Sequence, residues 1–392
     1  MAARLIVHIG QQKSGTTYLQ GILARSTVEL ATAGITYPLV SRPRRGRTVE
    51  NHEPATYGFL AHEYPWVAPT RVREERPNWD RLVAAVRDDP GTVLLSAEAL
   101  SVIREPAIRQ LVDGLGGGAT EIVITTRRLD RSLPSLWQQH VRNGRSTGLA
   151  TYLRGLSEQR DLPIVRIEGD SDQQIWRAFA VGRLARRWAA VVGPDQVRVV
   201  VNPGPATEVL WPRFSQAIGS AGLVAAPGAA ASLPVHTSLS GPEAAVLAAI
   251  NAALSDAGWD QETAERLRLR IIRDGFQGRP ERGRPIAIPP PFAERVAAWS
   301  AADLDELRAT GVEVIGEIGE LRVPVDRRPF VQVFADEVAG AAAAAMIGAS
   351  LDPEHWSSSL ARIVRRAVPH RIRVRRPRRV RRPGDSAKHE LG

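Results

Sequence analysis

Residues 4–20 read Arg-Leu-Ile-Val-His-Ile-Gly-Gln-Gln-Lys-Ser-Gly-Thr-Thr-Tyr-Leu-Gln, and this stretch indicates the fold class. Residues 4–9 are a short, mostly apolar run with β-branched side chains, typical of a buried parallel strand. Residues 10–15 form a polar turn, and a helical spacing of apolar residues begins at Thr16. Gly34 suits the left-handed end of that helix, and residues 35–38 predict a second strand. A strand–loop–helix opening of this kind is typical of α/β sheets.

The same alternation continues along the chain. Short apolar runs predict further strands at residues 92–97, 121–126 and 196–201, and another short apolar run lies at residues 312–315. Helical periods predict helices at residues 78–88, 105–115, 132–141 and 173–192, and later at 241–258, 261–272, 292–310 and 338–351. We therefore expect an α/β fold: a P-loop-type, mainly parallel sheet flanked by helices, with a helical C-terminal half and a disordered basic tail. The predicted division is an α/β domain over residues 1–330, an Ala-rich helical extension over 331–360 and an Arg-rich tail over 361–392.

Composition excludes several classes of site. The chain has no cysteine, so disulfides, thiolate nucleophiles, zinc ribbons and iron–sulfur clusters are excluded. Its eight histidines show no paired metal-ligand spacing, so no dedicated metal site is expected. The start of the chain lacks the pattern of a secretory signal, and residues 338–351 are too short to span a membrane. We therefore expect a cytoplasmic protein without a transmembrane segment.

The formal net charge of +10 is a local feature of the sequence. Residues 361–392 contain eleven Arg, one Lys, one Asp and one Glu, which accounts for the whole excess. Such a tail could contact anionic lipid or nucleic acid, steer an anionic ligand, or remain a solvated extension. Contact with lipid would place the protein peripherally at a membrane. In the rest of the chain Lys13 is the sole lysine, which draws attention to the loop around it.

The loop at residues 10–17 suits a phosphate-like anion. Its place between a strand and a helix directs backbone N–H groups and the positive end of the helix dipole at one point. Lys13 adds a charge, and three hydroxyl side chains add donors. The alternative is a tight turn in which Lys13 is solvated and Thr16 caps the helix. The lysine precedes Gly15, so the loop is not a Walker A motif, and no strand ends in a magnesium-binding aspartate.

The segment Lys13-Ser-Gly-Thr-Thr-Tyr-Leu19 resembles the 5′-phosphosulfate loop of sulfotransferases that use 3′-phosphoadenosine 5′-phosphosulfate (PAPS). The sequence from His8 to Gln20 most resembles that of bacterial members of this family. Many sulfotransferases have Trp where this chain has Tyr18. The resemblance spans roughly residues 3–325 and implies that PAPS is the sulfuryl donor and that no metal is needed. It implies a cofactor-binding role for Lys13, Ser14, Gly15, Thr16, Thr17 and Tyr18.

A second segment supports the same resemblance. The family binds the cofactor's 3′-phosphate with an arginine at the end of a strand and a serine eight residues later, and this spacing selects Arg127 and Ser135. The alternative is an exposed basic start of a helix. The Arg-Lys-Gly motif of cytosolic animal members is missing, and Arg279, Arg282 or Arg284 could replace it.

Transfer to an alcohol or amine needs a base. Resemblance implies a histidine or glutamate at the end of the sheet, and Glu98 follows the strand at residues 92–97. Its rival is His52, and His8 is expected to be a hydrogen-bonded core residue. Glu98 could instead be a helix N-terminal residue stabilised by the dipole. Lys13 would neutralise charge on the bridging oxygen as the bond to sulfur breaks.

These features favour a PAPS-dependent sulfotransferase whose acceptor is a hydroxyl or amine of a carbohydrate, glycolipid or other small metabolite. Two alternatives remain open. One is a nucleotide-dependent P-loop kinase, which would bind Mg-ATP. The other is a catalytically silent α/β protein whose tail binds polyanions, with an affinity indifferent to Lys13.

Overall fold

A parallel sheet forms the centre of the protein in the computed structural model. The structure describes residues 2–39, 43–44, 47–48, 51–116, 119–170, 174–204, 207–231, 238–277, 279, 281–324 and 335–350. Six strands follow the order β2-β5-β1-β6-β7-β8, and every neighbouring pair is parallel. Their bounds are β1 Arg4–Gly10, β2 Ile35–Thr36, β5 Thr92–Ser96, β6 Ala119–Arg127, β7 Val197–Asn202 and β8 Glu313–Ile315. The predicted α/β class and mainly parallel sheet are confirmed.

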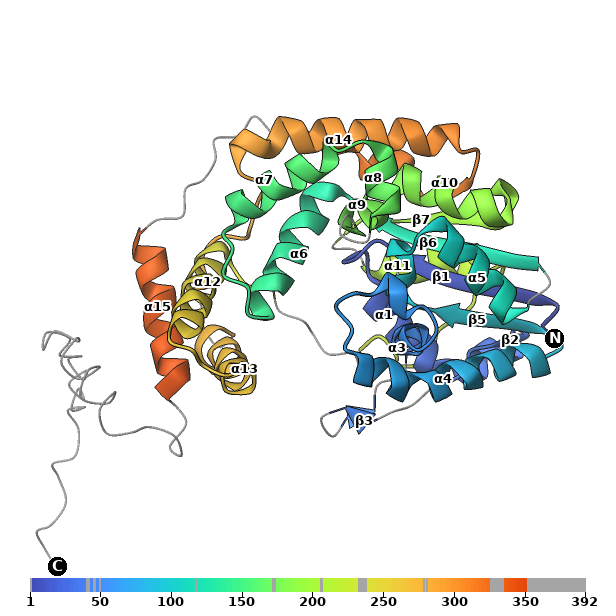
Figure 1. Ribbon diagram of the computed structural model, residues 1–392, viewed down its shortest axis with the longest axis horizontal. Helices are drawn as coiled ribbons and strands as arrows, with labels where there is room; N and C mark the ends of the chain where they lie inside the picture. Colours follow the sequence, from blue (N-terminus) through green and yellow to red (C-terminus); the bar gives the residue numbers. More distant parts are fainter. Residues whose placement is uncertain are drawn as a thin grey trace, which may run out of the picture.

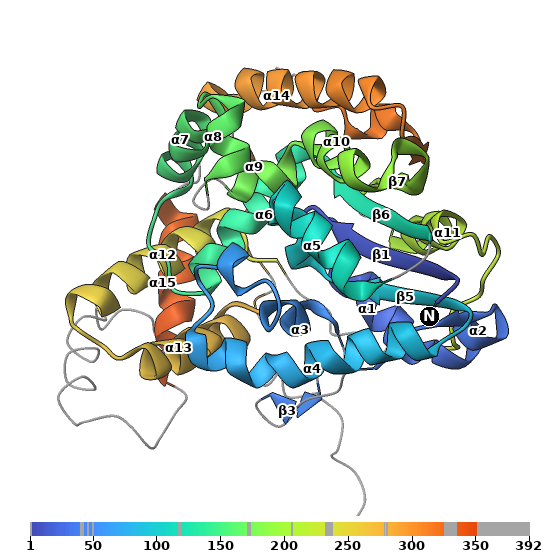
Figure 2. The same cartoon turned by 45° about the vertical axis from the view of Figure 1, so that its right-hand side comes forward.

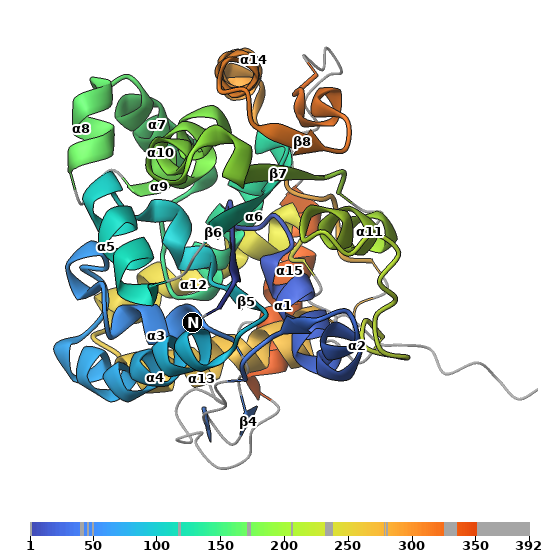
Figure 3. The same ribbon diagram turned by 90° about the vertical axis from the view of Figure 1, so that its right-hand side faces the viewer.

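Helices cover both faces of this sheet, as the edge-on view shows (Figure 3). One face packs against α1 (Thr16–Arg25) and α11 (Thr207–Ala217), through side chains such as Leu19 and Phe214. The other packs against α4 (Pro69–Asp88), α5 (Glu105–Leu115) and α10 (Val181–Val192), seen from the front in Figure 2. Strands buried on both sides need apolar residues at nearly every position, which explains the continuous apolar runs.

The remaining elements are short helices, a small hairpin and the helices of the C-terminal half. The shorter helices are α2 Thr27–Thr32, α3 Glu53–Tyr57, η1 Ala61–Glu63, η2 Glu98–Val102, α8 Ile164–Gly169, α9 Gln174–Phe179, η4 Pro194–Gln196 and η6 Ile318–Leu321. The others are α6 Leu129–Arg142, α7 Leu149–Arg160, α12 Gly241–Asp256, α13 Gln261–Arg270, η5 Ile271–Phe276, α14 Pro290–Ala309 and α15 Ala335–Ser350. The hairpin pairs β3 Pro43–Arg44 with β4 Arg47–Thr48.

The C-terminal half is helical, as expected. The helices α12, η5 and α15 share a hydrophobic cluster with Trp137 of α6, at the end of the molecule away from β2 (Figure 1). The backbones of η5 and α15 approach closely, since a Cβ on Gly275 would lie 2.5 Å from the carbonyl oxygen of Ala344. The predicted extension over residues 331–360 is thus described over α15, and the boundary at residue 330 stays a prediction. The predicted disordered tail, residues 361–392, lies outside the described residues.

Four helix predictions differ from the structure, and α11 was not predicted. The helix predicted from Thr16 to its end at Gly34 is two helices, α1 and α2, which are separated at Ser26. The helix predicted at 78–88 begins at Pro69 in the structure. Its first half contains Pro77 and many charged residues, which hide the helical pattern, and it is stabilised by ion pairs such as Arg71 with Glu75. The helix predicted at 173–192 is two helices, α9 and α10, which are separated at Ala180. The helix predicted at 261–272 continues as the π-helix η5, and α7 was not predicted at all.

Candidate active site

The loop after β1 is fixed between two strands. Gly10 leaves no room for a side chain, because a Cβ there would lie 2.3 Å from the Thr125 hydroxyl of β6. On the other side, the amide nitrogen of Asn202, at the end of β7, donates to the carbonyl oxygen of Ser14 at 2.6 Å. Gly15 has φ of +101°, a conformation that L side chains rarely adopt. The two neighbouring strands thus hold the loop in one shape, together with the hydrogen bond from the N–H of Ser14 to the carbonyl oxygen of Gln11 at 3.1 Å.

The helix α1 starts directly after this loop, with Gly15 as its N-terminal cap residue. The first N–H groups of any α-helix have no partner within the helix, and here the cap residue is a glycine, which has no side chain to accept from them. The alternative in which Thr16 caps α1 is therefore wrong. The Thr16 hydroxyl instead donates to the carboxylate of Glu98. The N-terminus of α1 thus presents backbone donors at the end of the loop, as an anion site requires.

Lys13 has an unusual backbone and an unpaired side chain. Its φ of +68° is the one positive φ of a non-glycine residue in the described part of the chain. Strain of this kind concentrates at functional sites. No ion pair or hydrogen bond among the described residues reaches its ammonium group. Burial lowers the pKa of Lys13, with Glu98 raising it and the charges of Arg142 and Arg127 lowering it further.

Arg127, at the end of β6, is a second half-buried cation without a partner for its guanidinium among the described residues, and its Nε is buried. Its backbone is fixed, because the N–H of Arg127 donates to the amide oxygen of Gln11 at 2.8 Å. Its neighbour Arg128 pairs with Asp130 at 2.6 Å, which leaves Arg127 as the available cation at this strand end.

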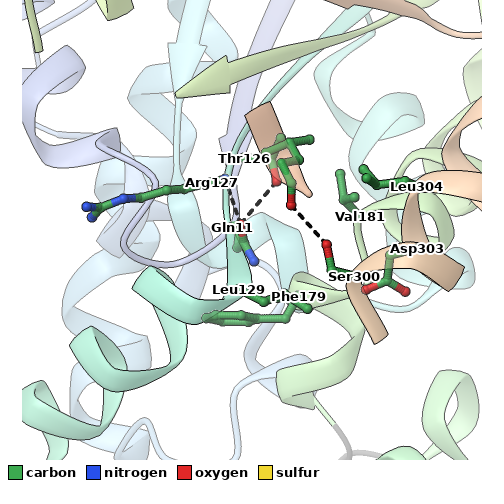
Figure 4. A pocket seen from close by; sticks show the side chains of 10 residues that line it. Gln11, Thr126, Arg127, Leu129, Phe179, Val181, Ser300, Asp303 and Leu304 are labelled. Carbon is green, nitrogen blue, oxygen red and sulfur yellow. Dashed lines mark hydrogen bonds between the residues drawn. The ribbon is translucent and has the colours of Figure 1, made fainter. Parts of the chain in front are cut away.

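Figure 4 shows the Arg127 side chain pointing away from Asp303 and the other residues of an adjoining cavity. That cavity measures about 10 Å³, too small for a nucleotide.

The end of α6 adds to this group of cations. Ser135 lies on α6, eight residues after Arg127, and is half-buried. Arg142, the last residue of the same helix, was not predicted as a site residue, yet its charge acts on Lys13. Like charges repel, so the cations that lower the pKa of Lys13 favour a bound anion at this point.

Glu98 begins η2 at the carboxyl end of β5. It lies close enough to the loop that Thr16 donates to it and that Lys13 affects its ionisation. Burial raises the pKa of Glu98 to about 7, the charge of Glu53 raises it as well, and Thr16 and Lys13 oppose both effects. A carboxyl group that titrates near neutral pH can take up a proton during a reaction.

The two histidines have different surroundings from Glu98. Both ring nitrogens of His52 are engaged: Nδ1 accepts from the N–H of Ser96 at 2.8 Å, and Nε2 donates to the carbonyl oxygen of Pro38 at 2.5 Å. The ring is buried, and burial lowers the pKa of His52 to about 4. His8 is buried as well, with Nδ1 2.8 Å from the Ser96 hydroxyl, as expected for a core histidine.

The other predicted cofactor-binding residues differ in how far their side chains are exposed. The Ser14 hydroxyl is turned inward, 2.9 Å from the Thr125 hydroxyl, and is buried. Thr17 is exposed, and Tyr18 is half-buried. The three residues considered for the missing motif lie near other acids: Arg282 pairs with Glu243 at 2.7 Å, Arg279 lies 3.9 Å from the same carboxylate, and Arg284 lies 3.8 Å from Glu337.

Sequence reasoning missed the residues that support the loop. Gln11, Thr125 and Asn202 fix its backbone, and their common signal is a polar residue at or just after the end of a buried strand. Within the described residues, no group of His, Asp or Glu is arranged to hold a metal ion. None of the described helices is both long and apolar enough to cross a membrane.

Comparisons with known proteins give one distant similarity. No family model matches the chain, and no curated protein sequence matches it. Among solved structures, the chain is similar to a sulfotransferase from Alicyclobacillus acidocaldarius, with 14% sequence identity and a TM-score of 0.40. The similarity covers 79% of this chain and 96% of that one.

Proposed function

We propose that this protein is a PAPS-dependent sulfotransferase that transfers the sulfuryl group to a hydroxyl or amine of a carbohydrate, glycolipid or other small metabolite. The observation that carries this proposal is the placement of two cations and one carboxyl group of raised pKa at one edge of the sheet. Among the described residues, no hydrogen bond or ion pair reaches the charged groups of the cations, Lys13 and Arg127, and the carboxyl group is Glu98. In parallel α/β folds this carboxyl edge is where ligands bind.

The donor's two charged ends match the two cations. The loop N–H groups and Lys13 suit the 5′-phosphosulfate, and Arg127 with Ser135 suits the 3′-phosphate, because a guanidinium can bind phosphate in a bidentate manner. The backbone at Gly204, with φ of +112°, lies beside the Arg127 guanidinium: a Cβ there would be in van der Waals contact with its Nη2, at 3.8 Å. The terminal hydroxyls of Thr17 and Tyr18 remain candidates for further contacts with the donor.

The reaction assigns a step to each side chain. Glu98 takes the proton from the acceptor as the acceptor's oxygen or nitrogen attacks sulfur. The bond from sulfur to the bridging oxygen breaks in line, and Lys13 neutralises the charge that develops on that oxygen of the leaving 3′-phosphoadenosine 5′-phosphate (PAP). His52 has no free ring nitrogen for the proton, which favours Glu98 as the base.

The first test is thermal unfolding with PAP, AMP and Mg-ATP. PAP at about 100 times its dissociation constant would stabilise the native state by about 2.7 kcal/mol. We expect stabilisation by PAP, little by AMP, and a reduced effect in Lys13→Ala. Stabilisation by Mg-ATP alone would favour the kinase alternative, and no response from folded protein would overturn the cofactor assignment.

The second test is transfer itself. Incubation with ³⁵S-labelled PAPS and a panel of hydroxylated and amino acceptors would detect labelled product. Loss of labelling in Glu98→Gln with PAP affinity unchanged would support the role of the base. Equal labelling by the wild type and Glu98→Gln would contradict it.

A further inference from the structure

The start of α3 is attached to the chain on both sides of Glu98. The carboxylate of Glu53, the first residue of α3, accepts from the N–H of Ala99 at 3.2 Å. His52, the residue before it, accepts from the N–H of Ser96 at 2.8 Å. The backbone that carries Glu98 is therefore held at the residue after it and at the second residue before it by two consecutive residues of one segment.

Glu53 is also a second carboxylate beside the candidate base. Its other oxygen accepts from the Tyr57 hydroxyl at 2.8 Å, so the carboxylate form is stabilised by two donors. The pKa of Tyr57 is raised by burial first, and then by both Glu53 and Glu98, so this phenol lies within reach of the two charges. After burial, Glu53 is the main cause of the raised pKa of Glu98.

We propose that Glu53 is a positioning residue for Glu98: its carboxylate orients the base through the backbone N–H of Ala99 and places a second negative charge beside it. This inference rests on the proposed function only for the identity of the reaction. The hydrogen bonds and the charge effect belong to the chain itself.

The groups around Glu98 fix the direction of the expected effect. Lys13 faces it from the loop, Thr16 from α1, and Glu53 and Tyr57 from α3. Removing the Glu53 charge leaves burial alone to oppose Lys13 and Thr16, so Glu98 would lose its proton at lower pH. The same change makes Glu98 a weaker base, which lowers the rate where it is already ionised.

The test is the pH profile of kcat/KM for Glu53→Gln, whose amide oxygen can still accept from Tyr57. We expect the acidic limb to move to lower pH by roughly one unit and the plateau to fall by roughly threefold, with unchanged affinity for PAP. Glu53→Asp, which keeps the charge, should restore the acidic limb. Glu63→Gln is the matched control: it neutralises a buried carboxylate that pairs with Arg104, and it should leave the limb in place.

A readout without turnover separates this inference from the proposed function. The carboxyl carbons of ¹³C-labelled glutamate can be titrated by NMR, with Glu98→Gln used to assign the signal of Glu98. In Glu53→Gln this signal should titrate at lower pH than in the wild type. Coincident titrations would overturn the inference even if the enzyme is active, whereas a shifted titration in a protein without transfer activity would support the inference and contradict the proposed function.

Discussion

Two groups of buried cations in this protein have opposite surroundings. Arg177 of α9 is fully buried, and its guanidinium donates to the carbonyl oxygens of Val102, Ile167 and Asp170 at 2.5–2.9 Å. Arg187 of α10 pairs with Glu168 at 2.7 Å. Both side chains are thus used to join helices to one another and to η2.

The cations at the carboxyl edge of the sheet lack such partners. Within the described chain, Lys13 and Arg127 receive no carboxylate or carbonyl oxygen, although burial lowers the pKa of each. A desolvated cation without a partner is unfavourable unless a ligand supplies the anion. Burial of a cation therefore does not by itself identify a binding site. At Lys13 and Arg127, burial coincides with the absence of a partner among the described residues and with the free N–H groups at the start of α1, and this combination points to a ligand.

The first prediction, with the largest effect, concerns the buried arginines that donate to carbonyl oxygens. Arg177→Met would leave three buried carbonyl oxygens without a donor and should lower the free energy of unfolding by about 3–5 kcal/mol. Urea unfolding would measure this loss. PAP affinity at low temperature should not change, and a variant with wild-type stability would contradict the structural role of Arg177.

Lys13→Ala tests the cations at the carboxyl edge of the sheet, which have no partner among the described residues. The rate of transfer should fall by about 10²–10³-fold, as when one stabilising donor is removed from a transition state. Because the ammonium has no partner in the described structure, the urea midpoint should stay close to that of the wild type. A large loss of stability would mean that Lys13 belongs with Arg177 and not with the site.

Arg127→Ala should have a smaller effect that depends on the ligand. Loss of a charged hydrogen bond to the 3′-phosphate should weaken PAP binding by about 1.5–3 kcal/mol. Adenosine 5′-phosphosulfate lacks that phosphate, and its affinity should be unchanged. Calorimetry with the two ligands measures the difference, and equal losses for both would remove Arg127 from the 3′-phosphate site. Arg128→Ala is the control, since Arg128 pairs with Asp130.

Gly15→Ala should give the smallest effect of the four. A side chain at φ of +101° is strained, and its Cβ would lie 2.6 Å from Cδ2 of Leu210. We expect a loss of about 1–2 kcal/mol in the free energy of unfolding, with weaker binding of PAP. Gly34→Ala is the comparison: φ is also positive there, but no atom lies within 4 Å of the added Cβ and the residue is far along the chain from the loop. It should cost stability without affecting PAP.

The sequence alone determined the α/β class and the location of most strands, because strands buried on both faces must be apolar throughout. It also singled out the loop at Lys13, since glycine, hydroxyl and lysine residues stand together between a strand and a helix. Arg127 at the end of β6 was selected by the resemblance, through its spacing to Ser135. The first half of α4 was not predicted because its charged surface residues hide the helical periodicity. The break at Ala180 was not predicted because the apolar periodicity continues across it, from one buried helix to the next.

Only the tertiary structure decided which polar side chains have hydrogen-bond or ion-pair partners. Residues far apart in the chain meet at the carboxyl edge of the sheet because parallel strands place their ends together: Thr16 reaches Glu98, Asn202 reaches Ser14, and Glu53 reaches Ala99. The same packing engages both nitrogens of His52 and leaves Lys13 and Arg127 without partners in the described structure. The sequence shows the residue types, but whether a side chain is hydrogen-bonded or free depends on neighbours that only folding brings within about 3 Å.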